Sequence, residues 1–419
     1  MKPYPAYKPS GVQWLGEVPS HWKVKKVKHI ALMRSGEGIT AEDIEDTGSY
    51  PVYGGNGCRG FTGQATHSGE FVLVGRQGAL CGNVHHVRGE FWASEHAVVS
   101  SFYMGDSPRW AAYMFELMNL GQYSVSAAQP GLAVERIQQL SLITPPVSEQ
   151  EAIATYLDRE TARIDELITE KGRLIDTLRE YRQATISEVV TQGLDPAAPK
   201  KPSGVPWLGE VPAHWEIKSL RRVTDGLAMN GIFKKNDEFG EGAPLVNVTD
   251  LFSDNFFVDG TSLERVRCSE QELNQYQVCD GDLFLVRSSL KLDGIAMFAV
   301  ARNIIEPTVF ECHVVRLRPD SSLCNSRFMA FFLNSSYGRQ SLISRSKSTT
   351  MTTIDQGEVL STYIVSPPLD EQKAIAAYLD TETARTDKLI EHVREEIKLL
   401  HELRAATITD AVTGKIKVS

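Results

Sequence analysis

The sequence has no apolar run long enough to cross a membrane, no Cys-x-x-Cys pair among its six cysteines and no excess of basic residues. A membrane helix needs about 20 apolar residues in a row, and a secretory leader needs a basic and then an apolar segment, so we expect neither. Unpaired cysteines are typical of reduced thiols in a cytoplasmic protein. The net charge of −9 argues mildly against a chain that binds nucleic acid by itself.

Motifs that carry catalysis are missing as well. The two Pro-Pro pairs, which begin at Pro145 and Pro367, lack the preceding Asp or Asn and the following aromatic residue of an adenine methyltransferase motif. The segment Gly75–Gly82 has the glycines of a phosphate-binding loop but no lysine. Cys81 with His85-His86 lacks a second ligand pair at zinc spacing. The acidic residues form no clear nuclease cluster with lysine, so we predict that the chain is not an enzyme and holds no metal.

What the chain does have is an internal repeat. The segment Pro202–Trp215 restates Pro9–Trp22, and Ser366–Asp380 restates Thr144–Asp158. The second match continues without gaps to about residues 194 and 416, with about half of its positions identical. The sequences between the repeated segments barely match. A duplicated frame with divergent inserts suits a protein that binds something in two non-identical halves.

Each copy of the second repeated segment predicts a long helix. Residues 148–190 carry apolar side chains at three- and four-residue steps, with Ser148 and Glu151 as a capping box, and the second helix starts with Asp370 as its cap. Helices of about 40 residues with one apolar stripe need a partner. The first runs from insert one to insert two and the second returns, so we predict an antiparallel pair; the alternative is that each helix packs on its own insert. The expected paired stripe is Leu167, Leu174 and Leu178 against Leu389, Val393 and Leu400.

The inserts predict mixed structure. Phe71–Val74 and Leu283–Val286 are typical of short buried strands, Ala97–Ser100 and His313–Leu317 of later ones, and Gly-rich turns separate them. We therefore predict an α+β protein with two α/β heads, separated by two long antiparallel helices that form a coiled coil, and with pseudo-twofold internal duplication. The predicted segments are 1–145 (first head), 146–194 (first helix), 195–366 (second head) and 367–419 (second helix).

The repeated motifs resemble those of the specificity (S) subunit of type I restriction-modification systems. The resemblance rests on Trp-Leu-Gly-Glu-Val-Pro-x-His-Trp at the start of each half, on Pro-Pro-x-x-Glu-Gln-x-x-Ile before each helix, and on the loop Tyr53–Thr62; it covers essentially the whole chain. It implies two target-recognition domains, each of which reads one half of a split site in double-stranded DNA. It also implies an adaptor that binds two methyltransferase (M) subunits and restriction/translocase (R) subunits. S-adenosylmethionine, ATP and Mg would belong to those partners, with no cofactor in this chain.

Two alternatives stay open at this point. One is a coiled-coil scaffold that assembles proteins without reading DNA. The other is an orphan subunit that targets a methyltransferase and has no nuclease partner. Because residues 1–145 carry no net charge, partners should supply much of the attraction for phosphate if the chain does bind DNA.

Candidate DNA contacts are polar and basic side chains on loops. Those in the first Gly-rich loop can reach base edges or phosphates, or can simply face water in a tight turn. Arg76 and Arg287 follow apolar strands at corresponding places, which favours a phosphate contact or a structural role over base reading. Four tryptophans in the repeats are expected to be packing anchors: Trp14, Trp22, Trp207 and Trp215. The predicted DNA-binding residues are Asn56, Arg59, Gln64, Arg76, Ser126, Gln129, Lys234, Lys235, Arg287, Lys291, Lys347, Thr349 and Thr350.

Overall fold

Two long helices and two compact units make up the structure. The computed structural model describes residues 3–418 apart from 13, 79, 104, 125–130, 292–293 and 349–350. Unit 1 comprises residues 1–172 and 395–419, and unit 2 comprises residues 173–394. Both α3 (Val147–Gln192) and α8 (Leu369–Val412) contribute residues to each unit. Within the described residues, no helix is long and apolar enough to cross a membrane. The two long helices are thus confirmed, while the division into four segments stays a prediction.

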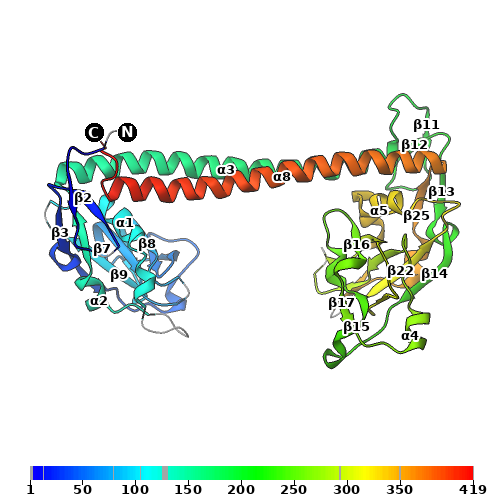
Figure 1. Ribbon diagram of the computed structural model, residues 1–419, viewed down its shortest axis with the longest axis horizontal. Coiled ribbons are helices and arrows are strands. Elements are labelled where there is room, and N and C mark those ends of the chain that lie inside the picture. The colour runs from blue at the N-terminus through cyan, green and yellow to red at the C-terminus, as the bar shows by residue number, and fades with distance from the viewer. Residues whose placement is uncertain are drawn as a thin grey trace. The chain divides into compact units, whose positions relative to one another are not determined.

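Unit 1 is built on a sheet of six strands in the order β4-β9-β7-β8-β5-β6. Its strands β7, β8 and β9 are labelled in Figure 1. Neighbouring strands are antiparallel except β5 and β8, which are parallel. Two strand pairs, β1-β2 and β10-β3, complete its β structure. The bounds are β1 (Tyr7–Pro9), β2 (Glu17–Pro19), β3 (Lys23–Lys26), β4 (Ala31–Ser35), β5 (Tyr50–Gly54), β6 (Gly57–Thr62), β7 (His67–Gly75), β8 (Val84–Ala93), β9 (Ala97–Phe102), α1 (Pro108–Leu117), α2 (Val134–Gln139) and β10 (Ser141–Thr144).

Unit 2 has a sheet of five strands in the order β14-β22-β18-β20-β16, with two three-stranded sheets beside it, β17-β15-β21 and β19-β24-β23. Its strand pairs are β11-β12 and β13-β25. The bounds are β11 (Lys200–Pro202), β12 (Glu210–Pro212), β13 (Glu216–Ser219), β14 (Thr224–Asn230), β15 (Phe239–Val246), β16 (Phe257–Asp259), β17 (Glu264–Val266), α4 (Glu270–Gln275), β18 (Leu283–Val286), β19 (Ser288–Ser289), β20 (Phe298–Arg302), β21 (Val309–Phe310), β22 (Val314–Pro319), α5 (Ser326–Asn334), α6 (Ser336–Ile343), β23 (Lys347–Ser348), β24 (Thr352–Thr353), α7 (Gln356–Ser361) and β25 (Tyr363–Ser366).

The central strand of each main sheet is covered on both faces, which is why its sequence is continuously apolar. In β7, Val72 and Val74 join the core formed with α1, α3 and α8, while Leu73 joins a smaller cluster on the other face. In β18, Leu283 and Leu285 pack toward the long helices, whereas Phe284 and Val286 face the opposite way. Both predicted central strands are therefore confirmed.

Ion pairs join α3 to α8 within each unit. In unit 1, Arg404 Nε lies 3.1 Å from Asp165 Oδ1. In unit 2, Arg182 Nε lies 2.9 Å from Asp387 Oδ1. The gapless match of the two helices places Arg182 against Arg404 and Asp165 against Asp387, so the two units contain the same interhelical pair with the helices exchanged. The two long helices thus lie side by side in each unit, and their antiparallel coiled coil stays a prediction.

The buried stripe between the helices differs from the predicted one. Leu167 and Leu174 are each 41% exposed and Leu389 is 46% exposed, so the prediction that they pack in the seam is wrong. Val393 of the predicted stripe is buried as expected, and the other buried side chains are also β-branched: Ile164, Ile175 and Ile390. Leucine and β-branched residues alternate along both helices at similar spacing, so periodicity alone does not distinguish the seam from the neighbouring face.

The predicted capping box is also wrong. Helix α3 begins at Val147, so Ser148 lies inside its first turn instead of preceding it. The backbone N–H groups of Glu149 and Gln150 donate to the carbonyl oxygen of Pro146, at 2.9 and 3.0 Å. The proline itself therefore occupies the position expected for a cap, and its fixed φ suits that place.

The repeated motifs meet in space at the start of each long helix. Glu149 of α3 accepts hydrogen bonds from Trp22 Nε1 (2.9 Å) and Tyr4 Oη (2.8 Å), and its other oxygen lies 2.7 Å from His21 Nε2. In unit 2, Glu371 of α8 accepts a bond from Trp215 Nε1 at 3.0 Å. Both indole rings are fully buried, so the expected anchoring role of these two tryptophans is confirmed.

A second matched contact joins each short helix to a long one. Gln150 Oε1 accepts a hydrogen bond from the backbone N–H of Ser107, just before α1, at 2.8 Å. Gln372 Oε1 accepts one from the backbone N–H of Asn325, just before α5, at 2.9 Å. About two helical turns further along each long helix, Arg109 bonds to Asp158 and Arg327 bonds to Asp380. The repeated Glu-Gln dipeptide therefore fixes each head to its helix.

The Glu149 cluster predicts an acid-dependent stability. Burial acts to raise the pKa of Glu149, but three hydrogen-bond donors outweigh it and hold the pKa below its ordinary value of 4.5. A carboxyl group with a depressed folded-state pKa stabilises the fold above its unfolded pKa and loses that contribution as pH falls through the folded value. Glu149→Gln should therefore lower the free energy of unfolding by about 1 kcal/mol at pH 7, and the difference should shrink below about pH 4. Chemical denaturation at pH 7, 5 and 3 measures it, with exposed Glu166→Gln as control. Parallel pH curves for wild type and Glu149→Gln would contradict it.

Candidate nucleic-acid interface

A hollow with both polar and apolar lining lies beside the unit 1 sheet. It encloses about 530 Å³ beside the turn that joins β5 to β6. We call it hollow 1, and it is lined by Gly55, Asn56, Arg59, Gln77, Gly78, Leu80 and His96. Two of the predicted DNA-binding residues, Asn56 and Arg59, thus share a concave surface with side chains from two other turns.

Glycine makes the close packing of this turn possible. A Cβ on Gly55 would lie 3.2 Å from the carbonyl oxygen of His96 and 3.3 Å from that of Gln77, tighter than most side-chain contacts. Asn56 Oδ1 accepts a hydrogen bond from Asn83 Nδ2 at 3.0 Å, which fixes the amide at the rim. The Gly-rich loop is therefore a tight turn, and it also presents polar groups to a hollow.

Arg76 links three segments of the chain beside hollow 1. Its backbone N–H donates to the carbonyl oxygen of His96 at 2.8 Å, and its own carbonyl accepts from Leu132 at 2.9 Å. Its guanidinium donates to Ser35 Oγ at 3.0 Å. The next residue, Gln77, has its Oε1 3.1 Å from His96 Nδ1. Arg76 and His96 thus form one hydrogen-bonded turn pair.

Unit 2 repeats this turn pair around Arg287. The backbone N–H of Arg287 donates to the carbonyl oxygen of His313 at 3.0 Å, and its carbonyl accepts from Ile354 at 2.9 Å. The next residue, Ser288, has its Oγ 2.7 Å from His313 Nδ1. Arg287 Nε is buried without a hydrogen-bond partner in the structure. The correspondence of Arg76 and Arg287 predicted from sequence is confirmed by these shared contacts.

A second hollow of about 660 Å³ lies beside the Arg287 turn pair. We call it hollow 2, and it is lined by Val248, Phe252, Ser288, Ser289, Leu290, Lys291, Gly294, His313 and Met351. Leu290 is 80% exposed, a large apolar side chain left open to solvent at the rim. Hollow 2 therefore has a wider apolar wall, whereas hollow 1 has amides and a guanidinium beside its single leucine, Leu80. Hollow 2 also contains Lys291 from the predicted set.

The remaining predicted residues lie elsewhere. Gln64 lines a different hollow of unit 1, with Trp92. Lys235 is exposed, and its backbone N–H donates to Glu238 Oε2 at 2.9 Å. Lys347 is exposed and pairs with Asp355 at 2.7 Å. Four predicted residues lie outside the described part of the chain: Ser126, Gln129, Thr349 and Thr350.

Lys234 is held inside its head. Its side chain is 7% exposed, and its ammonium lies 3.2 Å from Glu238 and 3.1 Å from Glu272. Burial acts to lower the pKa of Lys234, but the two carboxylates outweigh it and raise the pKa. Both carboxylates already compensate this charge, so we assign Lys234 to the fold of the second head and leave it out of the DNA contacts proposed below.

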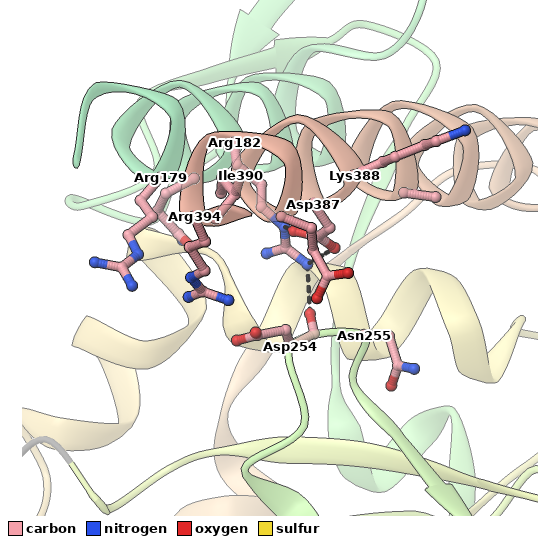
Figure 2. Close-up of a pocket in the computed structure, with 11 residues that line it drawn as sticks. Arg179, Arg182, Asp254, Asn255, Asp387, Lys388, Ile390 and Arg394 are labelled. Carbon is pink, nitrogen blue, oxygen red and sulfur yellow. Dashed lines mark hydrogen bonds and ion pairs between the residues drawn. The ribbon is translucent and has the colours of Figure 1, made fainter. Parts of the chain in front are cut away.

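Figure 2 shows a charged hollow of about 670 Å³ in unit 2, where both long helices meet the turn at Asp254 and Asn255. Arg182 donates a hydrogen bond to the carbonyl oxygen of Asp254 and forms an ion pair with Asp387. Its guanidinium carbon also lies 5.3 Å from the centre of the Phe256 ring. Burial raises the pKa of Asp387, although Arg182 opposes the shift. Acidic and basic groups alternate around this hollow and compensate one another, so its role is to fix the helices to the head.

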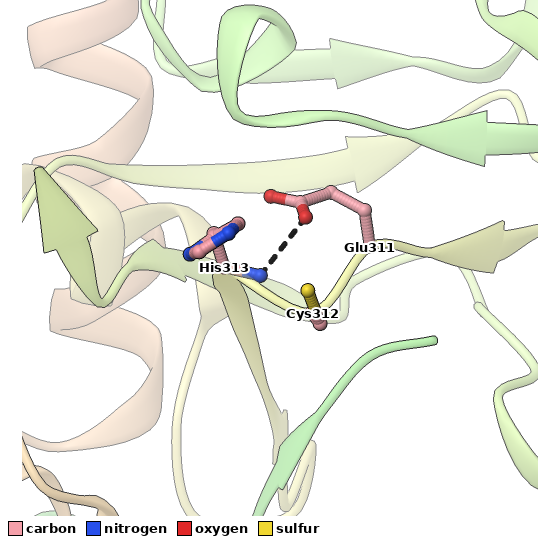
Figure 3. Close-up of side chains that lie close together, drawn as sticks. All are labelled: Glu311, Cys312 and His313. Atoms are coloured by element: carbon pink, nitrogen blue, oxygen red, sulfur yellow. Dashed lines mark hydrogen bonds between the residues drawn. The ribbon is translucent and has the colours of Figure 1, made fainter. Parts of the chain in front are cut away.

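Glu311, Cys312 and His313 have ligand atoms within 4.8 Å of one another, close enough to suggest a metal (Figure 3). However, Glu311 Oε2 accepts a hydrogen bond from the backbone N–H of His313 at 2.9 Å, and His313 Nδ1 is engaged with Ser288. Burial raises the pKa of the Cys312 thiol, which favours the protonated form that binds metals poorly. Three consecutive residues also lack zinc-site spacing. We therefore assign them to the turn before β22.

Sequence reasoning missed several residues of the two hollows. Gln77 and His96 line hollow 1, and Phe252, Leu290 and His313 line hollow 2. The two histidines carried a signal, since each immediately precedes an apolar strand at a corresponding place in its insert. The apolar residues carried none, because an exposed Leu in a loop has no distinguishing pattern.

The chain matches a family model over both halves, at residues 19–175 and 212–399, and the description of that model is "Type I restriction modification DNA specificity domain". The chain belongs to this family. The resemblance inferred from the repeated motifs is thereby confirmed.

Individual relatives agree with this assignment. The chain is 47% identical over 141 residues to the type I restriction enzyme EcoprrI specificity subunit of Escherichia coli, a match that spans 33% of this chain and only 35% of that relative. It is 25% identical over 315 residues to the MjaVIII specificity subunit of Methanocaldococcus jannaschii, covering 73% of this chain and 70% of that one.

Solved structures share the fold. One solved structure is described as the structural basis of complex assembly and conformational transition of the type I R-M system. Its matching chain is 17% identical to this chain with a TM-score of 0.72, and the match covers 95% of this chain and 99% of that one. The HsdS subunit from Thermoanaerobacter tengcongensis is 16% identical with a TM-score of 0.53, covering 95% and 98%. At these identities the likeness concerns the fold alone, which is mixed α/β, as predicted in outline.

Proposed function

We propose that this chain is the DNA-recognition and scaffold subunit of a type I restriction-modification complex, in which each head reads one half of a bipartite site in double-stranded DNA. The observation that carries the proposal is the family match over both halves of the chain. Two hollows at corresponding places support it, because their shared turn pair fits a common way of holding DNA and their different walls fit two different half-sites.

The paired helices would serve as the spacer between the heads, related by a pseudo-twofold axis. The exchanged ion pairs, Arg404 with Asp165 and Arg182 with Asp387, support equivalent halves. In this proposal α3 and α8 set the distance between the half-sites, while the repeated Glu-Gln contacts keep each head in a fixed position on its helix.

Matched apolar side chains support docking of two like partners. Leu167 and Leu403 are exposed within one turn of the unit 1 ion pair, and Leu403 is 53% exposed. Their counterparts in the repeat, Leu389 and Tyr181, are exposed beside the unit 2 ion pair, and Tyr181 is 56% exposed. Equivalent apolar surface in both units fits two copies of one protein, which we take to be the methyltransferase (M) subunit.

Catalysis would reside in the partners. The M subunits would bind S-adenosylmethionine and flip out the target adenine, and the R subunits would use ATP and Mg for translocation and cleavage. The chain itself would be non-catalytic and would bind DNA weakly alone, since its net charge is −9. Attraction for phosphate would rise when the partners dock.

Exchange of one head tests the proposal. Residues 25–143 of this chain are replaced by the matching segment of a related subunit of known specificity, and the hybrid is assembled with its M subunits. We expect one half-site of the methylated sequence to change and the other to stay, because each head reads independently. Sequencing of methylated adenines in exposed DNA gives the answer. A complex that assembles but methylates no defined sequence would indicate a scaffold without DNA readout, and a change in both half-sites would rule out independent heads.

A further inference from the structure

The two heads share a turn pair although their sequences have diverged. In each head an arginine follows the central strand, and its backbone N–H donates to the carbonyl oxygen of a histidine that precedes the neighbouring strand. The carbonyl oxygen of the same arginine accepts a hydrogen bond from the backbone N–H of a residue in a third segment. The residue after each arginine contacts the imidazole Nδ1 of that histidine. Since the surrounding residues differ, retention of this arrangement in both heads points to a task that both half-sites require.

The position of the turn pair relative to the hollows suggests that task. Gln77 and His96 line hollow 1, and Ser288 and His313 line hollow 2, so the same two positions form part of both hollows. Carboxylates flank both histidines: Glu95 lies 3.3 Å from His96, and Glu311 bonds to the backbone of His313. These carboxylates repel phosphate, so they oppose a phosphate contact by the imidazoles. We therefore assign contact with the DNA backbone to the arginines and a positioning role to the histidines.

The other walls of the hollows differ in chemistry. Hollow 1 offers Asn56, Arg59 and Gln77, and the amide and guanidinium groups match the edges of adenine and guanine. Hollow 2 offers Phe252 and Leu290 from its apolar wall, which match the C5-methyl group of thymine. Leu290 is 80% exposed, so its side chain is accessible to a base edge.

We propose that hollow 1 reads a purine edge, that hollow 2 contacts a thymine methyl group, and that Arg76 and Arg287 beside them hold the DNA backbone in both heads. This inference rests on the proposed function and assigns separate tasks to residues within it. Contacts that are shared by the heads position the duplex, and contacts that differ specify its sequence.

Uracil substitution tests the base contacts. DNA carrying uracil in place of thymine in the half-site read by the second head lacks the methyl group and should bind the assembled S–M complex roughly three- to fivefold more weakly. The same substitution in the other half-site should have no effect. Leu290→Ser should weaken binding of thymine DNA to a similar extent and should remove the response to uracil. Equal responses of wild type and Leu290→Ser to uracil would overturn the assignment of hollow 2.

Charge variants test the backbone contacts in the same complex. Arg76→Ala and Arg287→Ala should each weaken binding roughly tenfold for all sequences and reduce the slope of log affinity against log salt by about one. Arg76→Lys and Arg287→Lys keep the charge and should keep most of the slope, which separates a phosphate contact from a folding defect. Exposed Arg88→Ala and Arg267→Ala, one in each head, are matched controls that remove the same charge away from the hollows.

The outcomes distinguish the inference from the proposed function. If the wild-type complex binds no specific sequence, the proposed function fails. If the wild-type complex is specific but Arg76→Ala and Arg287→Ala behave like the controls, or if they alter the methylated sequence instead of the salt slope, only this inference is overturned.

Discussion

Replacing Leu167 and Leu403 together by aspartate should remove one of the two M subunits from the complex. Both side chains are exposed in unit 1 beside the Arg404–Asp165 pair. An apolar side chain at the centre of an interface contributes a large share of the binding energy, and a buried, unpaired carboxylate replaces that contribution by a penalty. We expect the affinity of that M subunit to fall more than about 100-fold, with one M subunit still bound to unit 2.

The internal repeat supplies the reciprocal variant. Leu389→Asp with Tyr181→Asp should remove the other M subunit, and the four changes together should remove both. Thr177→Asp introduces the same charge on an exposed position of α3 and serves as control. Native mass spectrometry of each complex counts the subunits. Because all the changed side chains are exposed, the free energy of unfolding should change by only about 0.5 kcal/mol each. Two M subunits on the fourfold variant would show that docking occurs elsewhere.

The outline of the fold could be predicted because it depends on patterns that repeat. The two long helices and the buried strands β7 and β18 follow from periodicity and from the internal repeat. The seam between the helices could not be chosen correctly. Leu167 and Ile164 lie one turn apart and are equally apolar, and only contact with a neighbour decides which is buried.

The candidate site could be predicted only in part. Glycines mark the turn that carries Asn56 and Arg59, and strand ends mark Arg76 and Arg287, so local sequence was sufficient for these. Lys234 shows the limit, because its partner Glu272 lies far along the chain and only the fold brings the two together. Hollow 2 combines four separate segments for the same reason.

If the paired helices act as a spacer, their length sets the distance between the two heads. Helix α3 has 46 residues and α8 has 44, and each passes through both units. Matched ion pairs fix the register in each unit, so residues added to one helix alone would shift Asp165 relative to Arg404 or Arg182 relative to Asp387. Residues added to both helices, after Gly172 and after Arg394 where the units divide, would leave both registers intact.

Seven residues added to both helices should therefore lengthen the gap between the half-sites. Two turns extend a helix by roughly 10 Å, which corresponds to about three base pairs of DNA. Those pairs also rotate the far half-site by about 100°, since the duplex turns once in about ten pairs, and nothing guarantees that the longer coil turns by the same angle. We expect either a longer spacer between unchanged half-sites or weaker binding from misaligned heads, and a larger loss when only one helix is extended. The sequence methylated by the lengthened protein decides the matter: full activity on the original spacer would mean that the helices do not set the distance.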